Sequence, residues 1–197
     1  MKSRIFIMMI MLAAVVPSAA IAHAQQSSKE TYTGTIISFG SGRNTRTTTG
    51  TFSLEITGAT SDAQAGRFLS VLIEGGQDSL LETIKNENLG RFSITGNLGR
   101  QINGVRISEV DGKKRIVAIF ERWLQFAEVR GGYRSVDYPF SIIEIFVDPV
   151  TGKGEGTFIA AARVRWVRDK KTDDYQVEIE NFGTFPAKLM GISRRNR

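Results

Sequence analysis

The chain after Gly90 is a succession of short segments that alternate between apolar and polar residues or are rich in Val, Ile, Phe and Thr. They are residues 91–95, 105–110, 115–123, 124–130, 140–147, 156–167, 175–182 and 187–192, and two earlier segments of the same kind are 30–39 and 51–57. About ten short strands at a spacing of roughly 8–12 residues favour an antiparallel β-sandwich or barrel over a parallel α/β sheet. We therefore expect a mainly β fold, with residues 25–197 in a single domain.

One interruption of the strand pattern, at about residues 61–88, predicts an inserted helical hairpin. Ser61 followed by Gln64 is a capping box, which marks the start of a helix. Apolar residues then recur with helical spacing at Ala65, Phe68, Leu69, Leu72 and Ile73. Gly75-Gly76 is expected to end this helix, and a shorter second helix follows to about Asn88. The hairpin is predicted to cover an end or a face of the sheet.

Two of the predicted strands are apolar on both faces. Residues 115–123 and 140–147 place Ile, Val and Phe at successive positions, so that neither face is polar. A strand of this kind is buried on both sides. We therefore expect both strands in the centre of the sheet, one of them covered by the helical hairpin.

The last long hairpin of the chain has a register that depends on its loop. If residues 170–173 form a four-residue loop, Arg165 lies opposite Glu178. Arg163 then lies opposite Glu180, whereas a register shifted by two residues places Arg163 opposite Glu178. Both registers keep the charged side chains on one face. The apolar residues of the first strand are expected together on the other face: Phe158, Ala160, Ala162, Val164 and Trp166.

The first residues of the chain have the pattern of a secretory signal peptide. Lys2 and Arg4 precede an apolar run over residues 5–16, and the segment ends in Ala22-His23-Ala24. As a membrane anchor this run is too short, because twelve helical residues span about 18 Å of a hydrocarbon core roughly 30 Å thick. We expect cleavage after Ala24, with Ala22 as the alternative, and an exported protein in the periplasm or outside the cell. No later segment has the length of a transmembrane helix.

Removal of residues 1–24 leaves a chain with neither histidine nor cysteine, because His23 is the single histidine and there is no cysteine. Catalytic triads built on histidine, and zinc, copper or haem sites built on imidazole or thiolate, are excluded. A calcium site at Asp169, Asp173 and Asp174 would lack the residue order of an EF-hand. We therefore predict no metal and no cofactor.

The charge of the chain is moderately basic. The formal net charge is +6 for the whole sequence, and it falls by two when Lys2 and Arg4 leave with the signal peptide. The excess is partly local, because Arg194, Arg195 and Arg197 lie at the end of the chain. Export makes a nucleic acid an unsuitable partner, whereas an anionic envelope polymer, a protein or an unknown small molecule remain candidates.

Three glutamates are candidate catalytic residues. Glu144 shares a strand face with apolar residues, where a carboxyl group can become a general acid. Glu178 and Glu180 share a strand face at a separation of about 7 Å, within the roughly 5–9.5 Å that glycosidases use. The simpler interpretation pairs each of them with an arginine of a neighbouring strand. That interpretation is favoured, so no catalytic residue is assigned.

An aromatic cluster is the candidate ligand site. Trp123, Tyr133 and Tyr138 surround Gly131-Gly132, and an aromatic loop at the end of a sheet is suited to a small ligand. Packing of these side chains within the turn is the alternative.

Several segments together resemble an uncharacterised family of exported bacterial proteins. They are Arg-Ile-Val-Ala-Ile-Phe from Arg115, Phe126-Ala127-Glu128, Tyr138-Pro139-Phe140 and Glu180-Asn181-Phe182-Gly183-Thr184. The resemblance covers most of the mature chain. It implies export, but no activity, cofactor or functional residue.

These observations favour an exported binding or interaction module without enzymatic activity. Two alternatives are a carbohydrate-cleaving enzyme that uses two carboxylates and a structural protein of the envelope with a basic surface.

The predicted cleavage has a direct test. Because the signal peptide is removed on export, intact-mass measurement of protein recovered from the cell envelope or the medium should give a chain that begins at Gln25. Full-length chain recovered from the cytosol would contradict both the export and the absence of histidine from the mature protein.

Overall fold

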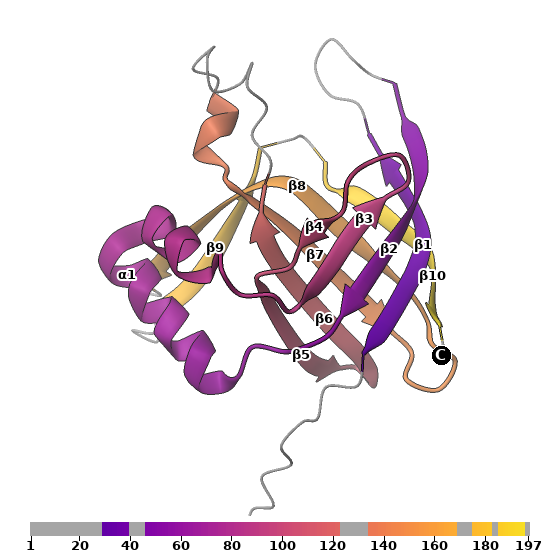
Figure 1. Cartoon of the computed structure of the whole chain (residues 1–197), viewed down its shortest axis with the longest axis horizontal. Coiled ribbons are helices and arrows are strands. Elements are labelled where there is room, and N and C mark those ends of the chain that lie inside the picture. The colour runs from indigo at the N-terminus through magenta and orange to yellow at the C-terminus, as the bar shows by residue number, and fades with distance from the viewer. Residues whose placement is uncertain (1–28, 40–45, 123–133, 169–174, 183–184, 196–197) are drawn as a thin grey trace, which may run out of the picture.

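The computed structural model describes residues 29–39, 46–122, 134–168, 175–182 and 185–195, which form an antiparallel sheet and one kinked helix on its outer side (Figure 1). The predicted signal peptide, the segment 124–130 and the loop 170–173 lie outside the described residues. The strands are β1 (Glu30–Ser38), β2 (Thr48–Ile56), β3 (Gly90–Ile94), β4 (Arg100–Gln101), β5 (Gly104–Val110), β6 (Lys113–Glu121), β7 (Phe140–Val147), β8 (Lys153–Arg168), β9 (Tyr175–Asn181) and β10 (Ala187–Arg195). The helices are α1 (Asp62–Ile84) and the short 3-10 helix η1 (Arg134–Asp137).

The sheet has the order β4-β3-β2-β1-β10-β8-β7-β6-β5, and β9 pairs with the second half of β8. Every strand pair is antiparallel. The sheet curls around a shared core without closing, so that the mainly β antiparallel fold predicted from the sequence is confirmed (Figure 1). The two-residue strand β4 was not predicted, because a segment this short has no periodicity.

The two edges of the sheet are joined by the chain itself. β4 pairs with β3, and β5 pairs with β6, yet only Ile102 and Asn103 separate β4 from β5. The Ile102 amide donates to the Gly90 carbonyl at 2.9 Å, on the β3 side. The next amide, of Asn103, donates to the Ile119 carbonyl at 3.0 Å, on the β6 side. One bend of the backbone therefore connects one edge of the sheet to the other.

The inner core contains the inward-facing residues of the curled sheet, among them Phe92, whose ring contacts three other phenylalanine rings. The ring centroid of Phe92 lies 6.0 Å from that of Phe52, 5.8 Å from that of Phe120 and 5.1 Å from that of Phe158. Other buried members are Tyr32, Ile36, Leu54, Ile56, Ile116, Ala118, Ile143, Ile145, Val147, Leu189 and Ile192.

A second apolar layer lies between α1 and the outer face of β6, β7 and β8. Its buried members are Leu72, Leu80, Ile84, Phe140, Ile142, Ala162 and Val164, and Val117 and Ile119 of β6 pack against them. Alternate residues of β6 and β7 therefore enter the inner core and the helix-facing layer. Both strands are interior strands of the sheet, as predicted, and β7 is covered on both sides, with α1 over its outer face. The outer face of β6 is only half-buried, at Val117 and Ile119.

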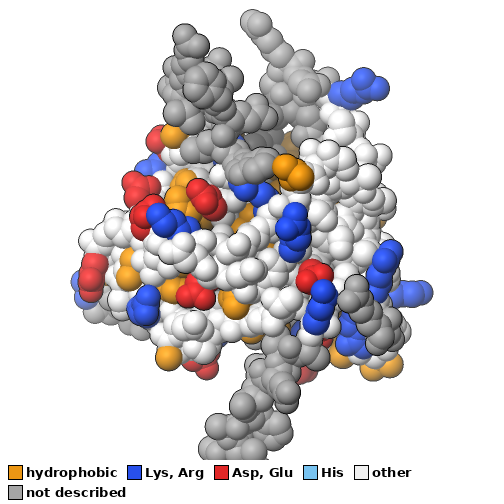
Figure 2. Space-filling model, viewed as in Figure 1, with side chains coloured by type: hydrophobic (Ala, Val, Ile, Leu, Met, Phe, Trp, Pro, Cys, Tyr) orange, Lys and Arg blue, Asp and Glu red, His pale blue; other side chains and the backbone are white. Residues whose placement is uncertain are grey.

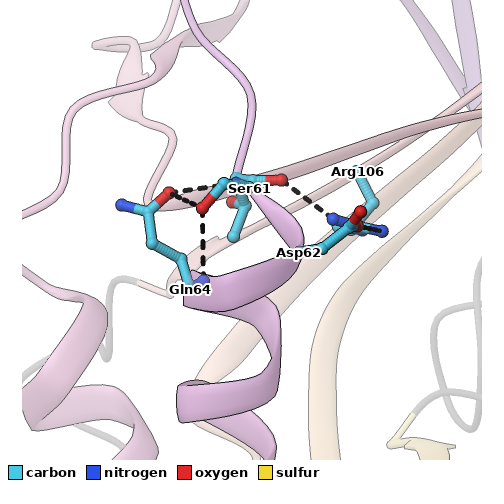
Figure 3. A network of polar contacts seen from close by, with 5 residues as sticks. Ser61, Asp62, Gln64 and Arg106 are labelled. Carbon is cyan, nitrogen blue, oxygen red and sulfur yellow. Dashed lines mark hydrogen bonds and ion pairs between the residues drawn. The ribbon is translucent and has the colours of Figure 1, made fainter. Parts of the chain in front are cut away.

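The helical insertion begins at the predicted residue and breaks at the predicted glycine pair, but it ends a few residues earlier than predicted. Ser61 Oγ accepts from the Gln64 amide at 3.2 Å, and the Ser61 amide donates to Gln64 Oε1 at 3.0 Å, which completes the capping box (Figure 3). Gly76 turns the chain with φ 72° and ψ −169°, a conformation that favours glycine. The predicted break at Gly75-Gly76 is therefore confirmed, because α1 consists of two helical segments that meet at Gly76. The second segment ends at Ile84 instead of near Asn88.

The β8–β9 hairpin has the first of the two registers that the sequence allows. Arg165 lies opposite Glu178 and Arg163 opposite Glu180. The prediction that Phe158 shares a face with Val164 is wrong, because β8 contains an irregularity between its pairings with Phe140 and Ile142 of β7. An extra residue in one strand reverses the alternation of faces. Phe158 thus packs against the inner core, whereas Ala162 and Val164 belong to the helix-facing layer.

The side chain of Asn103 ties the bend between the two sheet edges to the end of α1. The residue is 3% exposed. Its Nδ2 donates to the carbonyl oxygens of Lys85 at 3.1 Å and Glu87 at 3.0 Å, and its Oδ1 accepts from the Glu121 amide at 3.0 Å. Both N–H groups and the oxygen of this amide are thus engaged. These bonds explain why the helix stops where it does.

We expect Asn103→Ala to lower the free energy of unfolding by about 1–3 kcal/mol, because the Lys85 carbonyl and the Glu121 amide lose their bonds to this side chain and the Glu87 carbonyl loses one of its two donors. Urea denaturation followed by far-UV circular dichroism measures the change. Gln101→Ala is the matched control, since Gln101 donates to the same Glu87 carbonyl at 2.6 Å from an exposed position. Its removal should cost less than about 1 kcal/mol. Equal losses for the two variants would contradict the role assigned to Asn103.

Candidate functional site

An apolar groove of about 490 Å³ lies between α1 and the outer face of strands β5 to β9. Its helical wall consists of Ala65, Phe68, Leu69, Leu72, Leu80 and Ile84. Its sheet wall includes Val117, Ile119, Ile142, Val164, Val177 and Ile179. Figure 2 shows apolar side chains at the surface on the side of α1, among charged side chains of both signs.

The first half of α1 faces this groove without packing closely against the sheet. Of its apolar stripe, Leu72 is buried, whereas Ala65, Phe68 and Leu69 remain partly exposed. The second half of the helix packs closely through Leu80 and Ile84. The groove is thus the part of the helix–sheet interface that the protein's own side chains do not fill.

The far wall of the groove is also open. Val177 and Ile179 of β9 are 52% and 44% exposed. Ile179 lies directly opposite Val164 of β8, so these residues share the sheet face that looks towards α1. The apolar surface therefore continues from the helix-facing layer to the edge of the β8–β9 hairpin.

The end of the groove at β5 and β6 carries two arginines, together with Thr60 and Ser108. Arg106 donates from Nη1 to the Thr60 carbonyl at 2.9 Å and from Nη2 to Asp62 Oδ1 at 2.7 Å (Figure 3). Arg115 donates from Nε and Nη2 to Glu144 Oε1, each at 2.7 Å. The groove thus combines a long apolar part with one end that holds two arginines, each paired with a carboxylate.

Separate attachments hold α1 over the sheet. At its start, Thr60 exchanges hydrogen bonds with Val105 of β5, in addition to the Arg106 contacts. At the kink, Gln77 Nε2 donates to the Asp137 carbonyl at 3.0 Å, and the Val164 amide donates to Gln77 Oε1 at 3.4 Å. At the end of α1, the side-chain amide of Asn103 donates to the Lys85 and Glu87 carbonyls. Because the helix is attached at its start, kink and end, it does not settle onto the sheet to fill the groove.

Glu144 is paired with an arginine of the neighbouring strand, as the simpler interpretation predicts. It lies on the helix-facing side of β7 and bonds to Arg115 of β6. Two N–H donors of one guanidinium hold the same carboxylate oxygen, which fixes the position of the Glu144 side chain. This arrangement suits a structural ion pair.

Glu178 and Glu180 lie on the opposite face from Glu144. Their neighbours Val177 and Ile179 line the groove, so the two glutamates point to the other side of β9. Arg165 Nη2 lies 3.2 Å from Glu178 Oε2 and 3.4 Å from Glu180 Oε2. The structure therefore does not bring Glu144 together with either of them.

Of the three predicted ligand-binding aromatics, Trp123 and Tyr133 lie outside the described residues. Tyr138 is 2% exposed, and its ring packs edge-on against Phe182 with centroids 5.1 Å apart. Its hydroxyl donates to Glu180. The described contacts of Tyr138 are those of a packed side chain.

Arg106 and Arg115 were not singled out from the sequence, although the apolar stripe of the helix was. An arginine on a strand has no local feature that separates a groove residue from an ordinary surface charge. Among the described residues, no group of three or more acidic, histidine or cysteine side chains is placed to hold a metal ion. Nor does any helix in this part of the chain have the length and hydrophobicity to cross a membrane.

We expect Glu178→Gln and Glu180→Gln each to lower the free energy of unfolding by less than about 1 kcal/mol, since exposed cross-strand ion pairs contribute little. Glu180→Gln should have the larger effect, because Glu180 also accepts from the buried Tyr138. Urea denaturation measures the free energy of unfolding of both variants. Loss of an activity on a polysaccharide at unchanged Tm would instead make β9 an active site.

Comparison of the chain with protein-family models, with curated proteins and with solved structures finds no match. The resemblance to exported bacterial proteins therefore stays a prediction, and the function has to be inferred from the geometry of the groove.

Proposed function

We propose that the chain is an exported binding protein without enzymatic activity, and that it holds a small apolar or amphipathic molecule in the groove between α1 and the sheet. The observation that carries this proposal is the pair of apolar surfaces that face each other without meeting. Ala65, Phe68 and Leu69 on the helix and Val177 and Ile179 on the sheet stay partly exposed around one space. A molecule that covers them removes apolar surface from water, which favours binding.

The dimensions of the groove favour a small molecule over a protein. Its volume of about 490 Å³ lies within the range of roughly 300–1,000 Å³ that is typical of ligand sites. Such sites are mostly apolar and contain a few polar groups, as this groove does. A folded partner has no access to a space between two layers of one chain, whereas a flexible or flat molecule fits there.

Export is supported by the signal-peptide pattern of residues 1–24. A role in binding is supported by the candidate carboxylates as well, because Glu144, Glu178 and Glu180 are all engaged by arginines. None of these observations favours a carbohydrate-cleaving enzyme.

A fluorescent probe tests the groove. N-phenyl-1-naphthylamine, which fluoresces in apolar surroundings, should bind the mature chain. Ala65→Trp places an indole in the groove and should weaken this binding about tenfold or more, since it occupies the apolar space. Ala63→Trp is the matched control, because Ala63 lies on the exposed side of the same helix turn. No binding by the wild-type chain, or equal binding by the two variants, would contradict the proposal.

A further inference from the structure

The polar residues of the groove are gathered at one end. Thr60, Arg106, Ser108 and Arg115 belong to the region of β5 and β6, whereas the groove is apolar from there to β9. Between β5 and β9 lie four strand-to-strand spacings of about 4.8 Å, or roughly 19 Å in all. The groove is thus long, and its two ends differ in polarity.

At the β5–β6 end of the groove, the guanidinium of Arg106 is held more firmly than the carboxylate of Asp62 that pairs with it. Arg106 is bonded to the Thr60 carbonyl, and Thr60 is itself 7% exposed and bonded to β5. By contrast, the side chain of Asp62 is 94% exposed and is bound through a single oxygen. An exposed ion pair of this kind contributes only about 0–1 kcal/mol. Asp62 can therefore swing into water while the guanidinium remains in place.

Among the described residues, Arg106 and Arg115 keep N–H donors beyond those that bond to Thr60, Asp62 and Glu144. A guanidinium has five N–H donors, and the contacts of Arg106 and of Arg115 use two each. Ser108, which lies directly opposite Arg115 on β5, adds a hydroxyl. A carboxylate or similar anionic head matches such a set of donors through charge-assisted hydrogen bonds.

We infer that the groove selects a single-chain anionic amphiphile, with its anionic head at Arg106 and Arg115 and its alkyl chain extended towards Val177 and Ile179. This inference rests on the proposed function and assigns the ligand class and the orientation of the ligand. The anionic head displaces Asp62 from Arg106, and the alkyl chain covers the partly exposed apolar stripe of α1.

Three probes with the same alkyl chain test the charge preference: decanoate, decanol and decyltrimethylammonium, each used below its micelle concentration to displace N-phenyl-1-naphthylamine at neutral pH. Decanoate should bind most tightly and decyltrimethylammonium least. The advantage of decanoate over decanol should shrink as salt is added, because the arginine end of the groove is partly exposed to solvent.

Variants test the residues. Arg106→Gln and Arg115→Gln should each weaken decanoate binding about tenfold and leave decanol binding unchanged, since only the charged head loses a charge-assisted hydrogen bond. Arg67→Gln is the control, because it removes the same charge from an exposed position on α1 outside the groove. Asp62→Asn should tighten decanoate binding severalfold, a gain that a damaged fold would not produce.

The outcomes separate the two proposals. If decanol binds as tightly as decanoate and the arginine variants affect both alike, the groove binds apolar molecules and the assignment of an anionic head is wrong. If Asp62→Asn fails to tighten decanoate binding, the displacement of Asp62 is wrong. If the fluorescent probe itself does not bind, the proposed function fails, and this inference fails with it.

Discussion

The buried amide of Asn103 is the interaction on which the rest of the structure depends. It lies where the backbone passes from one edge of the sheet to the other, and it bonds to main-chain groups on both sides of that passage. A curled sheet with two unjoined edges would expose two rows of unpaired N–H and C=O groups. Here the backbone amide of Ile102 bonds to one edge of the sheet and the backbone amide of Asn103 bonds to the other. The same side chain fixes where α1 ends, so sheet and helix are positioned together.

The groove follows from this arrangement. Because α1 is held at its end by Asn103, at its kink through Gln77 and at its start through Thr60, its height above the sheet is set by polar contacts. The apolar side chains beneath the first half of the helix do not determine it. Interiors are normally closely packed, because unfilled space forfeits dispersion contacts. A helix fixed by polar attachments over an incompletely filled apolar interface is suited to receive a ligand.

The candidate site was only partly predictable from the sequence. The apolar stripe that begins at Ala65 was recognised, and the register that pairs Arg165 with Glu178 was one of two alternatives. Both depend on local periodicity and on loop length. The sequence does not reveal that Arg106 and Arg115 stand at the end of a groove, since that depends on where α1 lies relative to β5 and β6. The three glutamates were candidate catalytic residues because carboxylates can act as acids, bases or nucleophiles, but their partners are arginines of adjacent strands.

By itself the sequence determined the antiparallel strands, the capped start of α1 at Ser61, and the burial of β7 on both faces. These features follow from residue periodicity, from turn chemistry and from apolar residues on both sides of a strand, all of which act over a few residues. Only the tertiary structure decided that the irregularity in β8 turns Phe158 and Val164 to opposite faces, and that Asn103 joins two edges. It also decided that the apolar stripe on the first half of α1 stays partly exposed. These outcomes depend on the spacing between elements far apart in the chain, which is set by packing and by long-range hydrogen bonds.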